Sequence, residues 1–304
     1  TAKGRAIQNL VNIESDDKVK AFICTQDLKD KDYINTHNLV MVTKQGQVKK
    51  TSLEKYSKPR ANGVAAITIK EGDELLEAKL TDGESQIILA VKSGKLVRFE
   101  ETKTRPMGRT ASGVRGISLK DDTDEVIGMV TVGKNDVADS QILVVTENGY
   151  GKRTKLVDDD GEDVYRITNR GGKGVKTLNI TEKTGKLISI NAVTDSDDLM
   201  IINKSGLTIR MAIEDLRVMG RATQGVRLIN LKGKDSISAV TKVMKDEAEE
   251  VVVDEDGNVV EPAIERVKPD MEVLEDEGSA EEEEDDDSDE EIEEDDSEHE
   301  ESEE

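Results

Sequence analysis

A short segment that ends in Gly-Val recurs along this chain, and its recurrence restricts the folds open to the sequence. The Gly-Val pairs begin at Gly63, Gly113, Gly174 and Gly225, at spacings of 50, 61 and 51 residues. A weaker copy, GRAIQNL, begins at Gly4. Glycine reaches positive φ and lets other groups approach the backbone closely. Each copy therefore indicates a turn that a side chain would block.

A second recurring unit lies before each of the four Gly-Val turns and is typical of a β-hairpin. It consists of an apolar run, a turn that contains glycine and a basic strand, and Asn148-Gly149 is its clearest turn. The copies read LVMVTKQGQVKK from Leu39, IILAVKSGKLVRF from Ile87, ILVVTENGYGKRT from Ile142 and LMIINKSGLTIR from Leu199.

Units of about 50 residues made of short strands predict an all-β repeat array, closed or ring-like, because one unit cannot bury its apolar face alone. We expect four such units and the end of a fifth, at residues 1–13. Residues 18–25 (KVKAFICT) add a predicted buried strand.

The charge divides the chain into two unlike parts. The 304 residues carry a net charge of −24, but residues 1–245 hold 41 basic and 34 acidic residues, a net charge of +7. Residues 246–304 hold 2 basic and 33 acidic residues. Residues 1–245 are therefore predicted to form one basic globular domain, long enough for a sizeable core. Residues 246–304 are an acidic tail that should be largely disordered, because it has too little apolar surface to offset the entropy of ordering.

Composition also excludes several kinds of site. The lone Cys24 permits no disulfide framework and no Cys-based zinc site, and His37 and His299 lie far apart. No apolar run approaches the roughly 20 residues of a membrane span, and no signal peptide is present. GGKGVKT lacks the ending of a Walker phosphate loop, so no ATP site is expected. Because the sequence does not begin with Met, we expect a C-terminal piece of a longer, cytoplasmic protein.

Basic residues keep the same period as the Gly-Val turns, which points to a polyanionic ligand. In residues 166–176 three glycines in four positions leave the backbone open, and Arg170 and Lys173 flank them as phosphate ligands would. The chain has no Trp, two Phe and four Tyr, so duplex DNA bound without sequence preference is expected instead of stacked single strands. The predicted DNA-binding residues are Arg5, Lys58, Arg60, Arg105, Arg109, Arg115, Arg166, Arg170, Gly171, Gly172, Lys173, Lys176, Arg217, Arg221 and Arg227. The alternative is a set of solvated surface charges, as any soluble domain carries.

Three segments resemble one known family. They are MGRTASGVRGI at Met107, NGYGKRT at Asn148 and VMGRATQGVRLI at Val218, and they are similar to the C-terminal domain of the A subunit of bacterial DNA gyrase, a type II topoisomerase. The resemblance covers nearly all of residues 1–243. It implies a β-pinwheel, a propeller-like ring of four-stranded blades whose outer rim wraps duplex DNA, with an incomplete N-terminal blade here. Residues 170–174 match the last five positions of the family's Gln-Arg-Arg-Gly-Gly-Lys-Gly box, although in a late blade where the family has it in the first.

The same resemblance implies the partners. They are duplex DNA, the remainder of a dimeric gyrase A subunit and the gyrase B subunit in an A2B2 complex near the nucleoid. The wrapped duplex would be presented for ATP-dependent negative supercoiling, with ATP and Mg²⁺ used elsewhere in the complex and no cofactor in this chain. The family's nucleophilic tyrosine follows an arginine, whereas Tyr165 precedes Arg166. This chain alone is therefore expected to lack the cleavage chemistry and the ATPase.

Two other functions stay open. The matching domain of the topoisomerase IV A subunit, with fewer blades and a decayed box, would assist decatenation. A non-enzymatic protein-interaction propeller would be expected to carry repeated aromatic motifs such as Trp-Asp. The acidic tail also has two interpretations, since it either aids solubility or competes with DNA for the basic rim as a tethered polyanion.

Overall fold

The structure is a computed structural model, and it describes residues 17–60, 62–233, 235–244 and 270–273. The partial repeat at residues 1–13, Arg5 and most of the acidic tail lie outside these residues. No helix in the described part of the chain is long and apolar enough to cross a membrane.

The four predicted hairpins are present. They are β1 (Asn38–Thr43) with β2 (Gln47–Ser52), β4 (Gln86–Val91) with β5 (Lys95–Glu100), β8 (Gln141–Thr146) with β9 (Tyr150–Lys155), and β12 (Asp197–Asn203) with β13 (Thr208–Ala212). Each turns at a glycine with a φ between 81° and 88°, namely Gly46, Gly94, Gly149 and Gly206. Positive φ at these turns is the reason that glycine recurs there.

The connections contain further strands and short helices. A long strand follows each hairpin: β3 (Leu75–Thr81), β7 (Val126–Val132), β11 (Leu187–Val193) and β15 (Ile237–Met244). Two-residue strands form at three of the Gly-Val sites: β6 (Val114–Arg115), β10 (Val175–Lys176) and β14 (Val226–Arg227). The helical elements are α1 (Lys31–Thr36), η2 (Leu53–Tyr56), η3 (Glu101–Lys103), η4 (Lys134–Asp136) and η5 (Ile213–Asp215). Within the acidic tail, Asp270–Val273 forms β16.

Neighbouring repeats exchange strands. The sheet orders are β3-β1-β2-β6, β10-β5-β4-β7, β11-β8-β9-β14-β16 and β13-β12-β15. Each hairpin pairs on one side with the long strand that follows it, and the first three hairpins also pair on the other side with a two-residue strand that follows the next hairpin. Thus Val114 pairs with Val48, and Val175 pairs with Leu96. A blade is therefore completed by the repeat after it.

The last sheet lacks the two-residue strand within the described residues, so one edge of β13 is open. A matching gap lies at the other end of the array. Residues 18–25 form no strand, and Phe22 is 77% exposed, so the predicted buried strand there is wrong. The reason is positional, because a strand leading into a hairpin pairs with the hairpin before it, as β3 pairs with β1. The described chain has no hairpin before β1.

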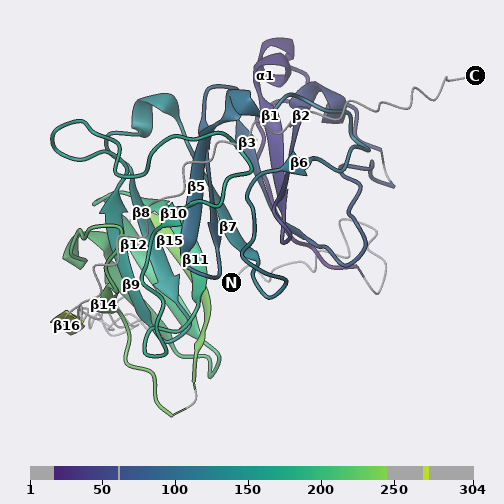
Figure 1. The fold of residues 1–304 in the computed structure, drawn as a ribbon. Coiled ribbons are helices and arrows are strands. Elements are labelled where there is room, and N and C mark those ends of the chain that lie inside the picture. The colour runs from purple at the N-terminus through teal and green to yellow at the C-terminus, as the bar shows by residue number, and fades with distance from the viewer. Residues whose placement is uncertain (1–16, 61, 234, 245–269, 274–304) are drawn as a thin grey trace, which may run out of the picture.

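The core lies between successive sheets, which follow one another across the molecule (Figure 1). In β4, Ile87 and Leu89 pack in the cluster shared with β1 and β2, whereas Ile88 and Ala90 pack in the cluster shared with β8. A strand buried on both faces needs apolar residues at every position. This double burial explains the unbroken apolar runs in the sequence.

Candidate nucleic-acid interface

Three loops of eight residues lead into the two-residue strands, and we call residues 106–113, 167–174 and 218–225 the basic loops. Each loop enters beside the second strand of the hairpin in the preceding repeat through a backbone hydrogen bond. The amide of Met107 donates to the carbonyl of Lys50 at 2.7 Å, that of Thr168 to Arg98 at 2.9 Å and that of Met219 to Arg153 at 2.9 Å. The same docking fixes all three loops at the same place on successive sheets.

Each basic loop ends at a glycine pressed against the strand that it joins. Gly113, Gly174 and Gly225 have φ values of 94°, 74° and 82°. A Cβ atom on these residues would lie 2.7, 2.5 and 2.6 Å from a backbone oxygen of the receiving strand. No side chain fits there. At these three sites the Gly-Val pair is thus the point where one repeat joins the sheet of its neighbour.

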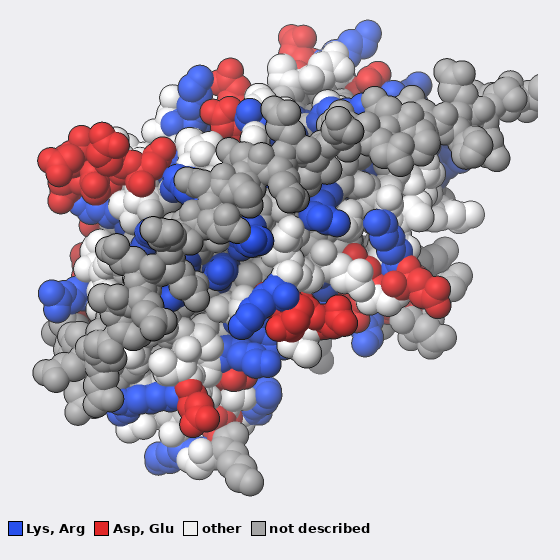
Figure 2. All heavy atoms as spheres, viewed as in Figure 1, with Lys and Arg blue, Asp and Glu red and all other residues white. Residues whose placement is uncertain are grey.

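Most of the predicted DNA-binding side chains reach the surface. Among those described, the exposed set is Lys58, Arg60, Arg105, Arg115, Arg166, Lys173 and Arg217, with Gly172. The half-buried set is Arg109, Arg170, Lys176, Arg221 and Arg227. Figure 2 shows one face, on which Lys and Arg side chains spread over the centre and lower part while the largest acidic cluster lies at the left edge. The exposed cations and the acidic groups are thus partly separated on this face.

The fourth residue of every basic loop is an arginine, namely Arg109, Arg170 and Arg221. Because the three loops dock in the same way, these arginines occupy equivalent positions. Two of them reach back to the connection that follows the hairpin of the preceding repeat. Nη1 of Arg109 donates to the carbonyl of Lys55 at 3.4 Å, and Nε of Arg170 donates to the carbonyl of Lys103 at 3.1 Å. These contacts orient the guanidinium groups on the protein surface.

The two predicted glycines of the 167–174 loop differ in their surroundings. Gly171 is buried, and its amide donates to the carbonyl of Gly116 at 2.8 Å. Ser118 donates to the carbonyls of both glycines. Its Oγ donates to that of Gly171 at 2.7 Å, and its amide donates to that of Gly172 at 2.9 Å. Gly171 therefore fastens the loop to the neighbouring repeat, whereas Gly172 is exposed where a ligand backbone could approach.

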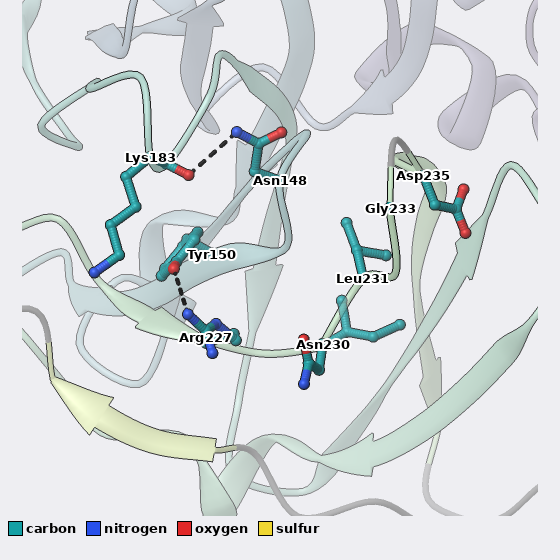
Figure 3. Close-up of a pocket in the computed structure, with 9 residues that line it drawn as sticks. Asn148, Tyr150, Lys183, Arg227, Asn230, Leu231, Gly233 and Asp235 are labelled. Carbon is teal, nitrogen blue, oxygen red and sulfur yellow. Dashed lines mark hydrogen bonds between the residues drawn. The ribbon is translucent and has the colours of Figure 1, made fainter.

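Arg227 lines an open polar cavity of about 320 Å³ beside the Asn148-Gly149 turn (Figure 3). Its Nη2 donates to the hydroxyl of Tyr150 at 2.9 Å, and its guanidinium carbon lies 5.5 Å from the centre of that ring. Lys183 lines the same cavity from another segment, and its carbonyl accepts from Nδ2 of Asn148 at 3.1 Å. Two cations, Arg227 and Lys183, and one carboxylate, Asp235, thus line this cavity from separate segments.

A further set of cations is buried and was missed from the sequence. Arg98 is 1% exposed, and its Nη1 donates to the carboxylate of Asp163 and the carbonyl of Tyr165, both at 2.7 Å. Lys50 donates to the carbonyl of Glu101 at 3.0 Å, and Nε of Arg153 donates to that of Leu216 at 2.6 Å. Each of these residues lies in the second strand of a hairpin and holds the connection after the next hairpin. A basic residue at the same strand position in every hairpin is the signal that could have revealed this role.

No group of three or more acidic, His or Cys side chains suited to a metal ion occurs among the described residues. Tyr165, the tyrosine next to Arg166, is fully buried, and its hydroxyl lies 2.7 Å from Oγ1 of Thr177. Burial raises the pKa of Tyr165. Its geometry is that of a core residue.

The comparisons with known proteins agree with this architecture. A family model described as "DNA gyrase C-terminal domain, beta-propeller" matches residues 37–82, 86–132, 140–194 and 197–244. Each match runs from the first strand of a hairpin to the end of the long strand that follows it. The chain belongs to the DNA gyrase C-terminal domain family. The resemblance to this family and the predicted all-β pinwheel fold are confirmed.

Members of this family with similar sequences include the DNA gyrase A subunits of Staphylococcus aureus. The subunit of strain MRSA252 is 42% identical over 265 residues, which cover 87% of this chain and 28% of the relative. The subunit of strain NCTC 8325 is 42% identical over 254 residues, which cover 84% of this chain and 27% of the relative. The chain thus spans little more than a quarter of the length of these relatives.

Two solved structures share the fold. The C-terminal domain of DNA topoisomerase IV superposes with a TM-score of 0.69 at 24% identity, covering 79% of this chain and 71% of the other. A DNA gyrase A C-terminal domain superposes with a TM-score of 0.65 at 22% identity, covering 80% and 76%. At these identities the similarity concerns the arrangement of sheets.

Proposed function

We propose that this domain binds duplex DNA along the basic loops and wraps it, as part of a gyrase A subunit. The observation that carries the proposal is the repeated docking of the basic loops, which gives Arg109, Arg170 and Arg221 equivalent places on three successive sheets. Cations repeated at equal structural intervals fit the repeated phosphates of a duplex. Bending DNA over 20–30 base pairs costs about 1–6 kcal/mol, which many phosphate contacts offset.

The wrap would supply geometry and no bond chemistry. It would present a neighbouring stretch of the same duplex to the cleavage domain of the complex with one handedness. The remainder of a dimeric A subunit and the B subunit would provide cleavage, ATP hydrolysis and Mg²⁺ in an A2B2 complex in the cytoplasm, at the nucleoid. A topoisomerase IV subunit is the second candidate, but the sequence identity of 42% is to gyrase A.

A topology assay tests the proposal. Closed circular DNA is relaxed by a nicking-closing enzyme in the presence of the chain, and the linking number is measured after protein removal. We expect a shift that grows with protein concentration and disappears when Arg109, Arg170, Lys173 and Arg221 are changed to Glu together.

The matched control reverses four exposed lysines away from the basic loops, namely Lys29, Lys31, Lys134 and Lys204. It carries the same net charge as the test variant and should keep most of the shift. Equal loss in both variants would mean that only net charge matters, and the basic loops would then not be the interface.

A further inference from the structure

Two lysines that point away from solvent lie under two of the three basic loops. Lys49 in β2 and Lys152 in β9 are both 0% exposed. The strand registers place Val97 of β5 and Ile209 of β13 at the same position in the other two hairpins. A buried ammonium group is costly unless hydrogen bonds compensate it. A lysine at a site that accepts Val or Ile elsewhere therefore calls for a reason.

The contacts of Lys152 supply one. Its Nζ donates to the carbonyls of Gly220 at 2.5 Å, Arg221 at 2.7 Å and Thr223 at 3.2 Å, and lies 3.1 Å from Oγ1 of Thr223. All these acceptors belong to the 218–225 loop. One ammonium group thus contacts oxygens along the whole turn from Gly220 to Thr223.

Lys49 repeats the arrangement under the 106–113 loop. Its Nζ donates to the carbonyl of Arg109 and to that of Ala66, the latter at 2.6 Å. The loop turns are also alike, since Ala111 donates its amide to Gly108 at 3.3 Å as Thr223 does to Gly220 at 3.5 Å. In both loops the lysine holds the carbonyl of the arginine at the fourth position.

The 167–174 loop has no such lysine, because Val97 lies at that position. It is fastened by the amide of Gly171 to Gly116, and it carries Lys173 within the loop itself. The basic loops are therefore of two kinds. The Met-Gly-Arg sequence shared by residues 107–109 and 219–221 marks the loops that rest on a buried lysine.

We propose that Lys49 and Lys152 are positioning residues for DNA binding, which fix the backbone of Arg109 and Arg221 so that both guanidinium groups meet the duplex already ordered. The inference rests on the proposed function. Ordering an eight-residue loop before the ligand arrives removes an entropic cost from binding. Neither lysine needs to contact DNA, because both are covered by the loops that they hold.

A double-mutant cycle on duplex binding tests the proposal. The variants are Lys152→Met, Arg221→Ala and their combination, with Lys49→Met, Arg109→Ala and their combination as a second cycle. Affinity for a linear duplex is measured by anisotropy over a range of salt concentrations. We expect Lys152→Met to weaken binding about as much as Arg221→Ala, several-fold, and to lower the salt slope by about one phosphate contact. The affinity of the double variant should be no lower than that of the weaker-binding single variant. Val97→Met, the control, should bind DNA as tightly as the parent does.

Other results would overturn the inference. Parental affinity in both lysine variants would show that the loops need no such support, and additive losses would show that the lysines act independently of the arginines. Loss of folding in both lysine variants would assign them a structural role only. If the arginine variants themselves bind as tightly as the parent, the proposed function fails, which is distinct from a failure of the lysine variants alone.

Discussion

The last glycine of each basic loop shows how much a single residue decides. Gly174 combines a φ of 74° with a Cβ position 2.5 Å from the carbonyl oxygen of Leu96. Gly63 has nearly the same φ, 75°, but a Cβ atom there would meet nothing within 4 Å. The two glycines therefore separate the cost of the backbone conformation from the cost of close approach.

Gly63→Ala should lower the free energy of unfolding by about 1–2 kcal/mol, the strain of positive φ alone. Gly174→Ala adds overlap with the backbone of β5, so its cost should be larger by about 1–3 kcal/mol. Urea unfolding of both variants measures the difference. Equal costs would mean that the contact with Leu96 relaxes easily.

Lys49 makes stability depend on pH. Burial lowers the pKa of Lys49 from 10.5 to about 8. Between these values the unfolded chain binds more protons at this residue than the folded chain, so the free energy of unfolding should rise with pH across that window. Each unit of pKa difference corresponds to about 1.4 kcal/mol. Comparing Lys49→Met with the parent by urea unfolding from neutral pH to about 10.5 isolates the effect, and parallel pH curves would refute it.

At the scale of elements, the second strand of each of the first three hairpins holds the connection that follows the next hairpin. Arg98 in β5 is the clearest case, because its guanidinium group reaches Gln86, Leu156, Asp163 and Tyr165. The residues from 156 to 165 thus depend on a strand of the hairpin before the one that they follow.

Arg98→Met should destabilise the fold by about 1–3 kcal/mol for each buried polar group left unpaired. It should also speed amide exchange locally, at Val164, whose amide donates to the carbonyl of Leu156. Arg115→Met, an exposed change on β6, is the control and should alter stability by no more than about 0.5 kcal/mol. Exchange that rises evenly over all sheets would argue against a local clamp.

The sequence predicted the hairpins but could not predict which strands pair with their outer edges. The runs from Ile87 and Ile142 are apolar at every position, and each turn has its glycine, so local rules were enough. The pairing of Val114 with Val48 depends on contacts distant in sequence, which no local pattern encodes. Likewise, residue type alone does not distinguish Arg98, which is buried, from Arg115, which is exposed; only the recurrence of a basic residue at the Arg98 position of every hairpin could have done so. The proposed roles of the exposed arginines stay predictions.

At the scale of the whole molecule, charge is the dominant asymmetry. Removing residues 246–304 changes the net charge from −24 to +7. The described part of that tail, β16, runs antiparallel to β14, the strand that carries Arg227. Through its described residues, the acidic region therefore pairs with the strand that carries a predicted DNA-binding residue.

Deletion of residues 246–304 should tighten duplex binding at low salt and have less effect at high salt, because screening weakens a tethered polyanion. Anisotropy titrations at several salt concentrations measure this. Met271→Pro keeps the charges but removes a backbone donor from β16. If the deletion tightens binding and Met271→Pro does not, the tail competes through its charge alone. If the deletion leaves the affinity unchanged, the tail has only a solubility role.

Strand exchange also has a consequence for synthesis of the protein. Val114 follows its partner Val48 by 66 residues, and Val226 follows Gly151 by 75. At about 5–20 residues per second, each of the first three blades therefore waits several seconds on the ribosome with a bare edge before its closing strand emerges. A nascent chain released early would always end in an unfinished sheet, wherever the interruption fell.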